Sequence, residues 1–157
     1  RNLSILSDGN FFMKKIIALF IFVILAACNS QKKYSDFDYS YSRSGGFAPI
    51  YENLLIKGNN AHYSFEGQGK KFKKDFKITS EERKKIENAL SQNNFRMIRE
   101  DYQKVYDNIS TSINVKIGNQ SGSKSDASMI MEGDKNRWNN ITSVFQEIIK
   151  NKINATS

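Results

Sequence analysis

The sequence predicts an α+β domain in which an antiparallel sheet of about five to seven strands carries two amphipathic helices packed on one face. Several stretches alternate strictly between apolar and polar residues, as half-buried strands do. Two later stretches place their apolar residues at helical spacing instead. Because each alternating strand is apolar on one side only, two helices suffice to cover the apolar face of the sheet.

The first predicted strand lies at the start of this domain. Phe37, Tyr39 and Tyr41 alternate with small or acidic polar residues, which is typical of a strand with one buried face. Segment 43–49 contains paired glycines and Pro49, and we expect it to break the strand. Glycine permits positive φ, and proline has no N–H for a strand ladder.

Three more strands are predicted before the first helix. Residues 51–57 and 61–66 flank a turn over residues 58–60, where a glycine and two asparagines favour a hairpin. Residues 71–78 follow, with phenylalanines on the apolar face and lysines on the solvent face. His62, the single histidine, is expected to face solvent.

Both helices have recognisable start signals. Thr79 and Glu82 have the spacing of a capping box, and the helix that they begin is expected to end at Asn93. The second helix is predicted over residues 134–152, with Asp134 as its N-cap. The apolar stripes are Ile86, Ala89 and Leu90 in the first helix and Trp138, Ile141, Phe145, Ile148 and Ile149 in the second.

The region between the helices contains the most regular alternation in the chain. Residues 109–117 alternate without interruption and predict a strand. Residues 120–131 are interpreted as its return strand, and residues 95–99 as a further strand. Residues 101–107 are expected to form a loop or a short turn.

Residues 13–28 have the parts of a secretory signal: two lysines, an apolar run over residues 16–27, and small residues before a cysteine. As a helix the run is roughly 18 Å long, too short for a hydrocarbon core of about 30 Å. The segment resembles the signal of bacterial lipoproteins, whose lipobox corresponds here to Leu25-Ala26-Ala27-Cys28. The resemblance implies cleavage after Ala27 and a lipid anchor on Cys28 that attaches the protein to a membrane of the cell envelope.

The expected organisation has four parts. Residues 1–12 are interpreted as translated leader, 13–27 as signal peptide, 28–35 as lipidated cysteine and tether, and 36–153 as a single α+β domain. No acidic run follows the cysteine, which favours a domain facing the periplasm. Without the first 27 residues, 21 basic and 15 acidic residues remain, a net charge of +6. This charge favours anionic headgroups or an acidic protein partner, and we expect no nucleic acid in this compartment.

The sequence contains no arrangement of residues typical of an enzyme. His62 has no second histidine with which to build a metal site, and Cys28 is the only cysteine. Carboxylate pairs such as Asp36 and Asp38 do not differ from ordinary solvated charges. We therefore expect a protein that is not an enzyme and that needs no cofactor and no metal.

Segment 43–48, Arg-Ser-Gly-Gly-Phe-Ala, follows an aromatic strand and is similar to a segment of emfourin-type domains, small protein inhibitors of thermolysin-like metalloproteases. The later helices and the strand between them also have counterparts in that family. The resemblance implies that Arg43 and Phe47 project toward a protease cleft, with Gly45 and Gly46 shaping the turn. The alternative is a purely structural bend in which Phe47 packs into the core.

A second functional interpretation is a structural or accessory envelope lipoprotein. Its partner would be an envelope protein or anionic headgroups, bound by a basic sheet face containing Lys71, Lys73 and Lys77. The same lysines are also typical of an edge strand protected against aggregation.

Overall fold

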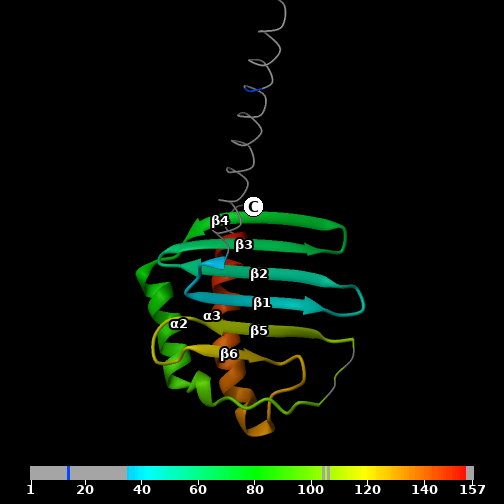
Figure 1. Ribbon diagram of the computed structural model, residues 1–157, viewed down its shortest axis with the longest axis vertical. Helices are drawn as coiled ribbons and strands as arrows, with labels where there is room; N and C mark the ends of the chain where they lie inside the picture. The colour runs from blue at the N-terminus through cyan, green and yellow to red at the C-terminus, as the bar shows by residue number, and fades with distance from the viewer. Residues whose placement is uncertain (1–13, 15–34, 104, 106, 155–157) are drawn as a thin grey trace, which may run out of the picture. The chain divides into compact units, whose positions relative to one another are not determined.

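The computed structural model describes Lys14 and residues 35–103, 105 and 107–154. The chain divides after Asp36, and residues 37–157 form one compact unit that contains every strand described. This unit is an α+β fold: a six-stranded antiparallel sheet with helices α2 and α3 against one of its faces (Figure 1). The predicted signal peptide and lipobox lie outside the described residues, apart from Lys14.

The strands are β1 (Tyr39–Gly45), β2 (Ile50–Lys57), β3 (Asn60–Gly67), β4 (Lys70–Lys77), β5 (Ile109–Val115) and β6 (Gly122–Ser125). The helices are α2 (Ser80–Gln92) and α3 (Lys135–Asn154), with short 3₁₀ turns η1 (Phe95–Met97) and η2 (Glu132–Asp134). Among the residues that the structure describes, no helix is long and apolar enough to cross a membrane.

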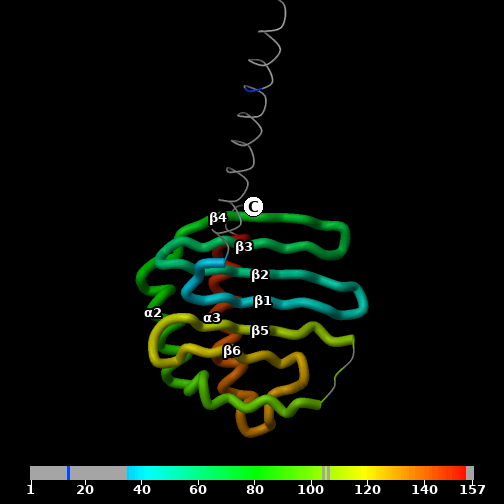
Figure 2. Tube along the Cα trace, in the orientation of Figure 1, coloured from blue at the N-terminus to red at the C-terminus, as the bar shows by residue number. Residues whose placement is uncertain are grey.

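The order across the sheet is β4-β3-β2-β1-β5-β6. The first four strands follow one another as hairpins, and the chain then passes through α2 before β5 pairs with the free side of β1 (Figure 2). Tyr41 is therefore opposite Leu54 on one side and Ile113 on the other. This register places Tyr41, Leu54 and Ile113 on the face that the helices cover.

The core lies between this inner face and the two helices. The rings of Tyr41 and Phe145 stack with their centroids 5.4 Å apart, so the central strand contacts the middle of α3 directly. Both predicted helical stripes are buried here. The sheet contributes Tyr39, Tyr41, Leu54, Ile56, Ala61, Tyr63, Ile113 and Val115 to the same cluster.

Helix α2 begins with the predicted capping box. The Thr79 hydroxyl oxygen accepts from the backbone N–H of Glu82 at 3.1 Å, and the Glu82 carboxylate accepts from the Thr79 N–H at 2.7 Å. Asn93 ends the helix, as expected. The two termini satisfy backbone groups that a helix of this length cannot satisfy internally.

Two of the predicted strands differ from the structure in extent or in type. Strand β1 continues through Gly45 instead of breaking at Arg43, because β2 and β5 pair with it on both sides up to that point. The predicted strand over residues 95–99 is a 3₁₀ turn. The fully buried side chains of Phe95 and Ile98 lie three residues apart, a spacing that brings them to the same side of a turn.

The return strand is much shorter than predicted. Only four residues pair with β5, those of Gly122–Ser125. Later in the predicted strand, Ile130 forms an isolated antiparallel bridge with Glu100. The backbone after Ser125 leaves the ladder where Asp126 bonds to Thr111 and to the indole N–H of Trp138. The carboxylate of Asp126 thus replaces further strand pairing.

Candidate functional site

The hairpin between β1 and β2 has the most exposed large apolar side chain of the described residues. Residues 46–49 form the turn, and Phe47 near its tip is 96% exposed. The alternative in which Phe47 packs into the core is therefore wrong. The turn carries the ring away from the sheet, since Gly45 and Gly46 have φ angles of 102° and 91°.

The start of β5 leaves no room for a side chain at Gly45 and little room at Gly46. A Cβ built on Gly45 would lie 2.7 Å from the carbonyl oxygen of Asn108, and one on Gly46 would lie 3.0 Å from Cγ1 of Ile109. The first distance is shorter than any ordinary contact, and its partner is backbone that cannot rotate away. The hairpin tip is therefore held against β5 by close packing as well as by its backbone conformation.

Arg43 lies further back on the inner face of the same hairpin. Its Nη1 is 3.2 Å from Oε2 of Glu52 on β2, and Oε1 of Glu52 accepts from the Tyr63 hydroxyl at 2.7 Å. Burial, followed by the bond to Glu52, raises the pKa of Tyr63 above its ordinary value, so this phenol stays a donor. Phe47 projects into solvent, as expected. Arg43 does not project, because it pairs with Glu52 on the inner face of the hairpin.

Other apolar side chains surround the tip. Tyr51 at the start of β2 is 62% exposed, and Ile109 at the start of β5 is also exposed. A surface depression of about 410 Å³ joins this end of the sheet to the β3–β4 turn, and it is lined by Pro49, Tyr51, Glu66, Gly67, Gly69, Lys70 and Lys71. Tyr51 was not among the site residues predicted from the sequence. The signal was present, because adjacent apolar residues Ile50 and Tyr51 cannot both point into the core from one strand.

The predicted basic residues lie on β4, on the sheet face opposite the helices. Lys71, Lys73 and Lys77 are all exposed there. Lys71 pairs with Glu66 at 3.0 Å, and the Lys77 ammonium group bonds to the side-chain oxygen of Asn60. Lys73 is opposite Ser64 on β3.

Phe72 departs from its predicted core position. It is 39% exposed, and its ring packs edge-on against Tyr63. Across the strands, Phe72 lies in the same row as Glu52 and Arg43, which form an ion pair. The helices therefore do not fully cover the inner face at this end of the sheet, next to the β1–β2 and β3–β4 turns.

His62 lies on the solvent face, as predicted, but it is not freely exposed. Its Nδ1 is 2.5 Å from Oδ1 of Asp75 on the neighbouring strand, and 17% of its side chain is exposed. Among the described residues, no three histidine, cysteine, aspartate or glutamate side chains form a group suited to a metal ion. The pair is accounted for as a cross-strand contact.

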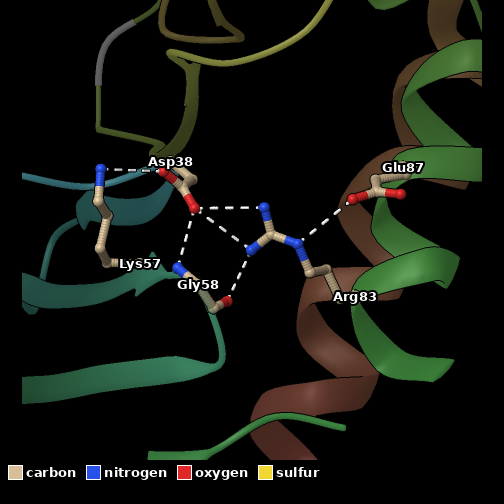
Figure 3. Close-up of polar contacts among 5 residues, drawn as sticks. All are labelled: Asp38, Lys57, Gly58, Arg83 and Glu87. Carbon is tan, nitrogen blue, oxygen red and sulfur yellow. Dashed lines mark hydrogen bonds and ion pairs between the residues drawn. The ribbon is translucent and has the colours of Figure 1, made fainter. Parts of the chain in front are cut away.

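A buried carboxylate joins the sheet to α2 (Figure 3). Asp38 is 6% exposed, and its Oδ2 accepts from the Gly58 N–H at 2.9 Å and from the Arg83 guanidinium at 3.2 and 3.3 Å. Its Oδ1 lies 3.2 Å from Nζ of Lys57. Burial by itself raises the pKa of Asp38, but these donors outweigh burial and hold the pKa below its ordinary value. A carboxylate held ionised in this way is a weak base. Its role is structural, because it connects the β2–β3 turn to α2.

Asp134 directly precedes α3, the position expected of its N-cap, and has a structural role comparable to that of Asp38. Its carboxylate accepts from the backbone N–H and Nε of Arg99, at 2.9 and 3.0 Å, and from Arg137 at 2.5 Å. These bonds to Arg99 and Arg137 lower the pKa of Asp134 far below its ordinary value. They join the segment after η1 to the start of α3.

Comparison with models of known protein families found no match, and no similar protein was found among curated proteins. The resemblance of segment 43–48 to emfourin-type domains stays a prediction that rests on the motif itself. A function for the chain has to be argued from the geometry of its own residues.

Replacing Gly45 by alanine is expected to destabilise the fold strongly. The new Cβ would meet the Asn108 carbonyl at a backbone conformation that L-residues avoid. Gly118→Ala is the matched control, because Gly118 also has positive φ but has no atom within 4 Å of its Cβ position. We expect Gly45→Ala to lower the free energy of unfolding by at least about 1 kcal/mol more than the control does, measured by urea denaturation. Equal losses would contradict the close packing.

Asp38→Asn is expected to lower stability in a pH-dependent way. The folded-state pKa lies below the unfolded value of about 3.9, so the ionised carboxylate stabilises the fold above that pH. This stabilisation is lost as the pH falls through the folded-state pKa. At neutral pH we expect the variant to lose about 2 kcal/mol of unfolding free energy, and the difference from wild type should shrink in acid. Asp107→Asn, on an exposed loop, is the control, and it should leave the free energy of unfolding nearly unchanged at every pH.

Proposed function

We propose that this chain is a lipid-anchored lipoprotein of the cell envelope that acts without catalysis, by presenting the β1–β2 hairpin to a protein partner. The proposed partner class is the thermolysin-like metalloproteases. The observation that carries the proposal is Phe47, which is 96% exposed at the tip of a turn held by two positive-φ glycines.

An aromatic side chain in this position is suited to binding. Fully burying a phenylalanine contributes about 1.5–3 kcal/mol, which the isolated domain leaves unused at Phe47. Aromatic anchors that fill a partner's pocket dominate the energy of many interfaces. Tyr51 and Ile109 extend the apolar surface on either side of the tip.

Rigidity of the hairpin supports the same proposal. The tight space between Gly45 and the Asn108 carbonyl, and the ion pair of Arg43 with Glu52, restrict the base of the hairpin before any partner binds. A preorganised loop loses little conformational entropy on binding. Inhibition would follow from occlusion of the protease cleft, and this chain would supply no chemical step.

The lipid anchor completes the proposal. Cleavage after Ala27 and lipidation of Cys28 would keep the domain at the membrane surface, facing the periplasm. Exported proteases that reach the envelope would then meet the hairpin at a high local concentration.

Phe47 is expected to carry most of the inhibition. The purified full chain in detergent micelles should inhibit a thermolysin-like metalloprotease at micromolar concentration, and Phe47→Ala should weaken inhibition by about thirtyfold or more. Stability should change by less than about 0.5 kcal/mol, because the ring is exposed. Met97→Ala removes another exposed apolar side chain outside the hairpin and should inhibit as wild type does. Absence of inhibition by the wild-type chain would refute the protease as partner.

The anchor is tested separately with Cys28→Ser. Without the thiol, the chain should incorporate no labelled fatty acid and should not be cleaved after Ala27, as measured by metabolic labelling and mass spectrometry of the N-terminus. Ala127→Ser, in an exposed loop, is the control and should be lipidated normally. Acyl-labelled Cys28→Ser protein would contradict the lipobox interpretation.

A further inference from the structure

Strand β4 forms one edge of the sheet and is regular over its whole length. It pairs with β3 through eight consecutive residues, Lys70–Lys77, and no other described strand pairs with it. It contains no proline and no glycine, and the register shows no bulge. Such an edge has the geometry that strand addition by another chain requires.

The turn before β4 determines which backbone groups point outward. Gln68 and Gly69, both with positive φ, form a two-residue turn between the opposite residues Gly67 and Lys70. That closing pair is hydrogen-bonded, and the bonding alternates along the ladder, so even-numbered residues of β4 bond to β3. The bond from the Ile78 N–H to the Asn59 carbonyl, 3.0 Å, agrees with this alternation. The residues whose N–H and C=O point away from β3 are Lys71, Lys73, Asp75 and Lys77.

The edge is strongly basic. β4 contains five lysines and one aspartate, a net charge of +4 over eight residues. Two carboxylates lie along it: Asp75 faces His62, and Glu66 faces Lys71. The middle of the strand, at Lys73, is opposite the neutral Ser64. Positive charge therefore dominates the surface next to the outward backbone groups.

We propose that β4 binds an acidic extended segment of a partner protein by strand addition. Backbone bonds at Lys71, Lys73 and Lys77 would hold the segment, and its carboxylates would lie beside these lysines. The same charge excludes a second copy of this chain, since two β4 edges would place +4 against +4. The partly exposed ring of Phe72 offers an apolar contact on the inner face of the added strand.

This surface does not include Phe47 at the hairpin tip, although Lys71 also lines the depression beside that tip. Phe47→Ala should leave binding at β4 unchanged, so failure of the inhibitor proposal and failure of this one are distinguishable. Likewise, loss of binding at β4 should not alter protease inhibition.

The test uses the full chain in micelles of a zwitterionic detergent. A labelled peptide of alternating glutamate and valine is compared with one of alternating lysine and valine, by fluorescence anisotropy. Amide hydrogen exchange is then measured by NMR. The acidic peptide should bind more tightly, and exchange should slow about tenfold or more at the amides of Lys71, Lys73 and Lys77, with little change at even-numbered residues.

Variants separate the backbone from the charge. Lys73→Ala removes the charge and keeps the outward N–H, whereas Lys73→Pro removes both without breaking a bond to β3. We expect the proline variant to bind the acidic peptide about tenfold more weakly than the alanine variant. Reversing Lys73 and Lys77 to glutamate should weaken binding about tenfold. Reversing Lys84 and Lys150, exposed on α2 and α3, should have little effect.

Three outcomes would overturn the proposal. Binding without slowed exchange at the odd-numbered amides would show electrostatic adsorption only. Equal binding of the two peptides would refute acidic selectivity. Slowed exchange at the same amides with vesicles of phosphatidylcholine and phosphatidylglycerol, but not with the peptide, would assign the edge to lipid headgroups. Circular dichroism will show whether Lys73→Pro folds. If it does not fold, the hydrogen-exchange pattern of the wild-type chain and the charge-reversal variants test the proposal without it.

Discussion

The buried carboxylate of Asp38 is the interaction on which the arrangement of sheet and helices depends. It receives the Gly58 N–H from the β2–β3 turn and the Arg83 guanidinium from α2, and Arg83 also donates to the Gly58 carbonyl at 2.6 Å (Figure 3). Arg83 extends the connection to Glu87 one turn further along the helix. Because a buried charge is costly unless it is fully partnered, these groups must meet for the domain to close.

Closure of the core at that end leaves the opposite end of the sheet open. There the inner face contains Arg43 and Glu52 and the partly exposed Phe72 instead of a continuous apolar layer. The Tyr63 hydroxyl marks the boundary, since its ring belongs to the core while its oxygen donates to Glu52. The proposed hairpin site thus projects from a part of the sheet that polar contacts, rather than helices, hold rigid.

The two proposed interaction surfaces both use strand backbone as a rigid support. The hairpin presents one large apolar side chain on a turn fixed by packing against β5. The β4 edge presents backbone groups flanked by lysines. Neither requires a titrating group or a nucleophile, and the buried carboxylates of Asp38 and Asp134 are engaged by arginine. Both proposed surfaces would therefore bind a partner without any chemical step by this chain.

The fold class, the capping box at Thr79 and the strand that became β5 could be predicted from the sequence, because alternation and capping depend on residues a few positions apart. The sequence also marked segment 43–48 as unusual. The pairing of Arg43 with Glu52, the exposure of Phe47 and the burial of Phe95 in a 3₁₀ turn became visible only in the folded domain. The partners of Asp38 lie 20 and 45 residues away along the chain. Such contacts follow from strand order and from how the helices cover the sheet, and no local periodicity encodes either.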